Sequence, residues 1–238
     1  MGPQQSTQLR TAIMEAYKRK GIEPHLPTFP DKVDEYPTFM DVHNILLEDD
    51  KKHGTLLGRM DLLFQLNLFR KETKLSFEEL MSGSYTLRLS QLPMNEIKAA
   101  IAEMIILAIH NYLLSQEQPR KLTRAVVLDE AHRVSQSNAL LELMREGRSF
   151  GIGMMIATQF PTDIGQGIYG CTETKLFLSN DQFIHAEAAA KQIEGGSTRQ
   201  EINELAEGIR NMKQFRAVLR NSQYPKVFLD VMPYYKRD

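Results

Sequence analysis

The spacing of apolar residues divides the chain into a helical first third and an alternating remainder. Residues 6–20 place apolar or small side chains at helical spacing, and residues 55–70 form a second, more strongly apolar helical segment. Thr38, followed three positions later by Asp41, predicts the N-terminus of a further helix. Four prolines within residues 22–37 predict a surface loop.

From about residue 84 onward, short apolar strands alternate with helices. The predicted strands are residues 85–90, 125–128, 152–157, 174–179, 215–219 and 227–231. The predicted helices of this part are residues 97–108, 140–147 and 186–193. Such alternation predicts βαβ units and an α/β fold with a mostly parallel sheet. The strand at residues 125–128 is continuously apolar, so it is expected to be buried on both faces.

The composition narrows the class of protein. Hydrophobic residues make up 42% and charged residues 25%, which is typical of a soluble globular chain with a core. No run reaches the ~18 uncharged apolar residues of a membrane helix, and no secretory signal begins the chain. The single cysteine, Cys171, excludes an internal disulfide and fits a cytoplasmic protein. A net charge of −1 excludes a bulk basic surface, so nucleic acid would have to be bound by local basic loops or an assembled channel.

Two consecutive carboxylates, Asp129 and Glu130, directly follow the apolar strand of residues 125–128. In a parallel α/β sheet, ligands bind beyond the carboxyl ends of strands, so this pair is expected beside a ligand. In P-loop ATPases one such carboxylate holds Mg²⁺, and a second acid can accept a proton from the attacking water. An isolated acidic pair more often caps the following helix. The strand before the pair and the residues after it favour the catalytic interpretation.

Three polar residues further along the chain complete the predicted site. Gln159 ends the next predicted strand, which places its amide at the same sheet edge as the carboxylates. There it can orient water or contact a γ-phosphate, or simply make a strand-end hydrogen bond. Arg145 and Arg148 are three residues apart on a predicted helix and therefore share a face. Taken alone, the two arginines are most simply a solvated surface pair.

The glycines and histidines offer no further site. Gly151 and Gly153 lack the third glycine and the following helix of a phosphate loop, so they predict a tight helix-to-strand connection. The six histidines show no metal-ligand spacing. His110 falls within a predicted helix and is expected to pack rather than to bind a metal.

Three linked segments resemble the HerA/FtsK-type ATPases, which are hexameric RecA-like motors that translocate DNA. These segments are residues 127–133, 145–151 and 157–161, with weaker similarity at residues 2–5, 37–42 and 89–93. The resemblance covers nearly the whole chain. It implies two domains, a helical region at residues 1–83 that lies between the two Walker motifs of the family, and a RecA-like core at residues 84–238, flanked by helices.

The resemblance also implies a role for each candidate residue. Asp129 corresponds to the Mg²⁺ aspartate, Glu130 to the catalytic glutamate and Gln159 to the sensor residue. Arg145 or Arg148 corresponds to an arginine that reaches a phosphate in its own or a neighbouring subunit. ATP and Mg²⁺ are the implied cofactors. The implied partners are DNA in the assembled motor, further copies in a homohexamer, and a nuclease or genome-defence system.

The chain departs from these motors at the phosphate-binding loop. A P-loop needs Gly-x-x-x-x-Gly-Lys-Ser/Thr, whose backbone amides and lysine hold the β- and γ-phosphates. None of the 14 glycines is followed by lysine. We therefore interpret the chain as a carboxy-terminal portion without Walker A, which can result from truncation, from a split gene or from degeneration of the motif. Such a portion is expected to leave a groove in the sheet where the P-loop strand belongs, and to be inactive alone.

Two other interpretations stay open. The chain can be a non-catalytic assembly module that binds a partner ATPase through an exposed sheet edge. It can also be part of a superfamily 2 helicase, because residues 129–132 have the sequence Asp-Glu-Ala-His, which is a motif of those helicases. The second alternative is weaker, since no second motor domain follows and the next strand ends in Ala-Thr-Gln.

Overall fold

The structure, a computed structural model, describes residues 2–23, 36–48, 50–66, 75–119, 121–233 and 235. Most of the predicted proline-rich loop, residues 24–35, lies outside the described residues, as does the end of the second predicted helix, residues 67–70. The chain divides into two compact units, Met1–Thr86 and Leu87–Asp238. The boundary expected from the sequence, between residues 83 and 84, stays a prediction.

The first unit is helical. Its helices are α1 (Pro3–Arg19), α2 (Phe39–Leu47), α3 (Asp50–Gln65) and α4 (Phe77–Ser82). The predicted cap of α2 is confirmed: the Thr38 hydroxyl accepts a hydrogen bond from the Asp41 amide, and the Asp41 carboxylate accepts one from the Thr38 amide at 2.6 Å. Ala12, Ala16 and Leu46 are nearly inaccessible to solvent, so α1 and α2 share a core. Arg19, at the end of α1, forms a bidentate ion pair with Glu48, which directly follows α2.

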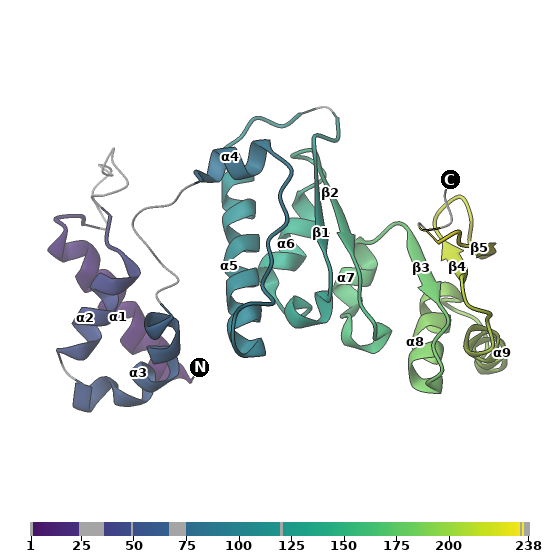
Figure 1. The fold of residues 1–238 in the computed structure, drawn as a ribbon, viewed down its shortest axis with the longest axis horizontal. Helices are drawn as coiled ribbons and strands as arrows, with labels where there is room; N and C mark the ends of the chain where they lie inside the picture. Colours follow the sequence, from purple (N-terminus) through teal and green to yellow (C-terminus); the bar gives the residue numbers. More distant parts are fainter. Residues whose placement is uncertain are drawn as a thin grey trace. The chain divides into compact units, whose positions relative to one another are not determined.

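The second unit contains all the strands of the described residues (Figure 1). Its elements are α5 (Asn95–Leu114), β1 (Arg124–Leu128), η2 (Ala131–Val134), α6 (Asn138–Glu146), β2 (Ile152–Ile156), η3 (Pro161–Asp163), α7 (Gln166–Cys171), β3 (Lys175–Leu178), α8 (Phe183–Ile193), α9 (Arg199–Arg210), β4 (Arg216–Arg220) and β5 (Val227–Asp230). The predicted α/β fold class is confirmed.

The strands form two separate sheets. β1 and β2 pair in parallel, in a register that runs from Arg124 opposite Ile152 to Leu128 opposite Ile156. β3, β4 and β5 form an antiparallel sheet, with a short turn between β4 and β5. The described sheets are therefore one parallel and one antiparallel. β2 and β3 belong to different sheets, so the edges they turn away from their partners are unpaired within the described residues.

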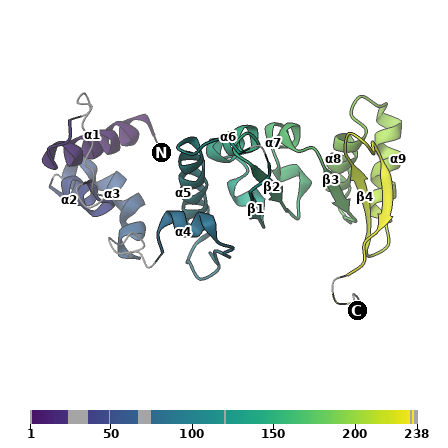
Figure 2. The same cartoon turned by 90° about the horizontal axis from the view of Figure 1, so that it is seen from above.

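Two expectations about individual strands are wrong. Residues 85–90 form no strand, because no described segment pairs with them, and Tyr85 and Leu87 are more than half exposed. β1 is not buried on both faces: the side chain of Val127 is 62% exposed, and its register partner Met155 is 64% exposed. Figure 2 shows α6 and α7 on the same side of the β1–β2 pair. The opposite face, which carries these two side chains, is uncovered among the described residues.

A glycine makes the connection from α6 to β2. Gly151 has a φ of +72°, a conformation that L side chains rarely adopt. A Cβ placed there would lie 2.6 Å from Pro119 and 2.7 Å from the Lys121 carbonyl. The Gly151 carbonyl accepts a hydrogen bond from the Thr123 amide at 2.8 Å, which fixes the start of β1 beside the start of β2. The predicted tight helix-to-strand connection is thus confirmed.

The antiparallel sheet has its own hydrophobic core. Phe177 and Val218 on one face of the sheet pack against alanine-rich α8 and against α9, whose Ala206 and Ile209 are fully buried. α9 does not appear among the helices predicted from the sequence. Its signal is present, however, since Thr198 and Glu201 form a capping box at its start.

Helix α5 packs against α6 through polar as well as apolar contacts. His110 is 7% exposed and its Nε2 lies 2.8 Å from a Glu146 carboxylate oxygen, and the Ser137 hydroxyl donates to Glu103 at 2.8 Å. The prediction that His110 packs is confirmed. Among the described residues, α5 alone is long and apolar enough to cross a membrane. Core helices of soluble proteins can have the same length and composition.

The capping box of α9 predicts a pH-dependent stability. Hydrogen bonds from the amide and hydroxyl of Thr198 hold the pKa of Glu201 below its usual range. A carboxylate with a lowered pKa stabilises the fold above its unfolded pKa of about 4.3, and that stabilisation is lost as the pH falls through the folded pKa. Glu201→Gln is therefore expected to lower the thermal unfolding midpoint at pH 7. The wild-type and variant midpoints should converge in acid when followed by circular dichroism; a constant difference at all pH values would contradict this assignment.

Candidate nucleotide-hydrolysis site

The parallel pairing of β1 and β2 brings the carboxyl ends of both strands to one edge. The ladder continues past the strands, because the Ala157 amide donates to the Leu128 carbonyl at 2.9 Å and the Ala131 amide donates to the Ala157 carbonyl at 2.8 Å. Asp129 and Glu130 therefore leave β1 beside the point where Gln159 leaves β2. β1 has a partner on one side only within the described residues, so it is an edge strand of the described sheet.

Glu130 adopts a left-handed backbone conformation, with φ of 55° and ψ of 44°. For an L residue with a Cβ this conformation costs roughly 1–2 kcal/mol. It ends the strand abruptly and starts the short helix η2, in which Ala131 and Val134 are buried. Glu130 is thus not a residue within a solvent-facing helix. Strained backbone of this kind often marks a functional position.

The Glu130 carboxylate is held from two sides. Gln159 Nε2 donates a hydrogen bond of 2.8 Å to Glu130 Oε1. His132 Nδ1 lies 3.2 Å from Glu130 Oε2, which is close enough for an ion pair when the imidazole is protonated, although hydrogen-bond geometry is not met. The structure therefore brings together Glu130 and Gln159, as the sequence predicts. It adds His132, whose position next to the acidic pair was the available signal.

Asp129 has the chemistry and exposure of a magnesium ligand. One carboxylate oxygen, Oδ1, accepts a hydrogen bond from the Glu130 amide at 3.0 Å, and the residue is exposed to solvent. Mg²⁺ commonly takes one or two protein carboxylates and completes its octahedron with water and substrate phosphates. Asp129 fits that pattern. No group of three or more potential ligand residues occurs in the part of the chain that the structure describes, so protein ligands alone would not hold the ion.

The two predicted arginines lie apart from this cluster. α6 ends at Glu146, so Arg145 is on the helix, whereas Arg148 is in the following turn, and the expectation of a shared helical face is wrong. The reason is Gly147, which caps the helix. Both arginines are exposed, and no hydrogen bond or ion pair joins either one to Asp129, Glu130 or Gln159.

The ends of β2 and β3 approach each other without pairing. The Asn180 side-chain amide, just after β3, donates to the Gln159 carbonyl at 3.4 Å. Nearby, the ring of His185 of α8 lies 4.8 Å from the Phe160 ring at an angle of 35°, and its Nδ1 lies 3.0 Å from the Thr162 hydroxyl. Side chains thus join the two sheets at this end while their backbones stay unpaired. Sequence reasoning identified neither Asn180 nor His185.

Comparison with solved structures shows the fold. The structure of VirB4 of Thermoanaerobacter pseudethanolicus matches 99% of this chain with a TM-score of 0.64 at 15% sequence identity. The genome-packaging NTPase B204 of Sulfolobus turreted icosahedral virus 2, in complex with sulfate, matches 68% of this chain and 74% of its own, with a TM-score of 0.48 at 14% identity. The chain has the α/β fold of the P-loop ATPases. It spans 65% of the VirB4 chain.

The family follows from the sequence match. Residues 62–231 match the type IV secretion-system coupling protein DNA-binding domain, and this chain belongs to that family. Its sequence contains no Walker A motif, and the family is close to the HerA/FtsK-type proteins that the sequence resembles. No protein of curated function matches it.

The backbone of Glu130 makes a stability prediction. Glu130→Gly and Glu130→Ala both remove the carboxylate contacts, but only glycine relieves the left-handed conformation. The glycine variant is therefore expected to exceed the alanine variant by about 0.5–1 kcal/mol in free energy of unfolding. Urea denaturation measures this difference.

The matched control is Glu142, an exposed residue of α6. There the order is expected to reverse, because glycine within a helix is about 1 kcal/mol less favourable than alanine. If the alanine variant is the more stable at position 130 as well as at position 142, Glu130 is not held in a left-handed conformation in solution.

Proposed function

We propose that this chain supplies the acidic half of the catalytic site of an ATP-hydrolysing DNA-translocating motor. The supporting observation is the Glu130 carboxylate, held by Gln159 at the ends of two parallel strands and next to Asp129. Membership of a coupling-protein DNA-binding family supports DNA as the substrate of the motor. The fold of P-loop ATPases supports ATP as the nucleotide that the motor hydrolyses.

Each residue has a role that follows from its position. Asp129 would hold Mg²⁺, which when bound neutralises phosphate charge. Glu130 would orient the attacking water and accept its proton. In the structure, Gln159 and His132 flank the Glu130 carboxylate, and its remaining lone pairs stay available to accept a hydrogen bond from a water. Through its hydrogen bond, Gln159 would couple the position of the Glu130 carboxylate to the position of the chain that follows β2.

The phosphate cradle must come from a segment that these 238 residues do not contain. None of the described residues offers the glycine-rich loop before a helix that holds β- and γ-phosphates. The unpaired edges of β2 and β3 suit the insertion of one further strand, which would unite the two sheets. That strand would not cover the face with Val127 and Met155, which would need a helix or another layer packed against it.

The proposal also covers the oligomer, the role of the two arginines and the functional partner of the motor. In a cytoplasmic homohexamer, Arg145 or Arg148 would reach a phosphate bound to a neighbouring copy; both side chains are exposed and without a described partner, as such a role requires. A nuclease or a defence system would be the functional partner of the motor.

A second candidate function rests on the same sheet edges. Exposed apolar residues next to unpaired strand edges also suit a non-catalytic module that docks on a partner ATPase. In that case Glu130 would be dispensable for turnover, while Met155→Lys would prevent assembly.

The chain alone is expected to bind ATP·Mg²⁺ weakly or not at all, because the P-loop supplies most phosphate contacts in this fold. Isothermal titration calorimetry on the 238-residue chain measures this affinity. A Kd in the micromolar range would show that these residues hold a phosphate site of their own.

The role of Glu130 is tested in a motor that contains both this chain and its Walker A segment. Glu130→Gln keeps the size and hydrogen bonding of the side chain but removes the proton acceptor, so steady-state ATPase activity should fall by about 10²–10⁴-fold. Nucleotide binding should persist, because Asp129 is intact. The control Glu142→Gln, on the exposed face of α6, should leave turnover unchanged. Full activity of Glu130→Gln would favour the assembly-module function.

The arginines are tested by mixing subunits in the same motor. Arg148→Ala should lower ATPase activity if its guanidinium reaches a phosphate bound to a neighbouring copy. Mixed with Glu130→Gln subunits, the Arg148→Ala subunits should regain part of that activity, since each variant supplies the group that the other lacks. If the mixture is no more active than the two variants separately, Arg148 does not act across a subunit boundary; Arg145→Ala is tested in the same way.

A further inference from the structure

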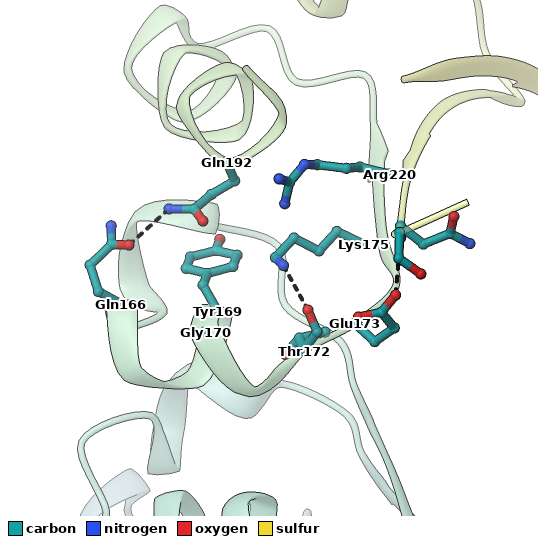
Figure 3. A pocket seen from close by; sticks show the side chains of 10 residues that line it. Gln166, Tyr169, Gly170, Thr172, Glu173, Lys175, Gln192 and Arg220 are labelled. Atoms are coloured by element: carbon teal, nitrogen blue, oxygen red, sulfur yellow. Dashed lines mark hydrogen bonds between the residues drawn. The ribbon is translucent and has the colours of Figure 1, made fainter. Parts of the chain in front are cut away.

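A polar pocket lies away from Glu130, where α7 and α8 meet the antiparallel sheet (Figure 3). Its volume is about 450 Å³. Lys175, the first residue of β3, and Arg220, the last residue of β4, stand opposite each other in the register and therefore on the same face. Tyr169 and Gln192 line the pocket beside them. The pocket thus collects side chains from four elements around two cations.

The two cations are held close together at a cost. Like charges directly opposite each other on neighbouring strands destabilise a sheet. Burial lowers the pKa of Lys175, and the adjacent Arg220 lowers it further. The Lys175 ammonium donates to the Thr172 carbonyl at 2.6 Å, whereas no described residue makes a hydrogen bond or an ion pair with the Arg220 guanidinium. A guanidinium that faces a cavity with its donors unused is suited to an oxyanion.

The acid of the pocket, Glu173, is already engaged. The Ser222 amide donates to the Glu173 carboxylate at 3.0 Å. The Ser222 hydrogen bonds, and more weakly Lys175 and Arg220, hold the pKa of Glu173 below its usual range. Glu173 is therefore ionised at neutral pH. With two cations and one carboxylate, the titratable side chains of the pocket sum to one positive charge.

We propose that this pocket binds a phosphodiester group of a nucleic-acid backbone, with Arg220 and Lys175 as its cationic contacts. A phosphodiester carries one negative charge, which matches the single net positive charge of the pocket, whereas a free nucleotide triphosphate carries several. The planar guanidinium offers two parallel N–H donors to two phosphate oxygens. The Gln192 amide, which donates to Gln166 at 3.2 Å, forms a neutral polar wall. The assignment of the ligand to DNA rests on the proposed function, whereas the presence of Lys175 and Arg220 in the pocket does not depend on it.

The experiment compares two doubly substituted chains of equal charge. Lys175→Gln with Arg220→Gln removes the pocket cations, and Arg199→Gln with Lys213→Gln removes two exposed cations of the same unit. Fluorescence anisotropy with a labelled single-stranded oligonucleotide measures DNA affinity at several salt concentrations. The pocket variant is expected to bind about tenfold or more weakly than the control, with the same loss for every sequence tested. It should also show a salt dependence shallower by about one charge.

A second arm separates the pocket from the motor function. Inorganic phosphate is titrated into each chain at constant ionic strength, and the backbone amide resonances of Tyr169 and Ser222 are followed by NMR. Shifts in the wild type that disappear in the pocket variant, together with the loss of DNA affinity, support the proposal. Equal DNA affinity of the two variants overturns it while leaving the proposed function intact. If the wild type binds no DNA, the assignment of the pocket to a nucleic-acid backbone is overturned, whereas the proposed function stands, because there the assembled motor binds DNA. Phosphate shifts at the pocket would then favour a free phosphate ligand, and an absence of shifts would overturn the site itself.

Discussion

The parallel hydrogen bonding between β1 and β2 is the constraint on which the candidate site depends. Strands that run in the same direction must end at the same edge, so the residues after Leu128 and after Ile156 meet there. A one-residue change of register would move every side chain of one strand to the other face. Gly151 fixes that register, because its carbonyl binds the start of β1 and its own conformation delivers the chain into β2. The contact between Glu130 and Gln159 is thus a consequence of a glycine at the opposite end of the strands.

Local patterns in the sequence predicted which candidate residues lie close together. The apolar run before Asp129 and the polar end of the next strand locate Glu130 and Gln159 correctly, because both depend only on strand direction. The tight connection at Gly151 and the cap at Thr38 were also predictable, since each rests on a short-range steric or hydrogen-bonding rule. The functional roles of these residues stay predictions.

Features that depend on tertiary contacts were not predictable. The uncovered face of β1 could not be read from residues 125–128, because an apolar run shows what a strand can bury and not what is present to cover it. The prediction that Arg148 lies on a helix was wrong, because residue spacing does not show where a helix ends. The end of α6 depends on its cap, Gly147. The pocket at Lys175 and Arg220 depends on the register of two strands that are far apart in the sequence. Spacing along the chain holds no information about such a pair.

The separate core beneath β3, β4 and β5 has a mechanical consequence. Phe177, Val218 and the alanines of α8 form a cluster that needs no contact with β1 or β2 to remain buried. Local opening in proteins follows the boundaries of such clusters. The strand ends around Glu130 can therefore shift while the antiparallel layer keeps its shape. In the proposed motor, that layer would move as a rigid body and transmit displacements at the candidate site to the surfaces of α8 and α9.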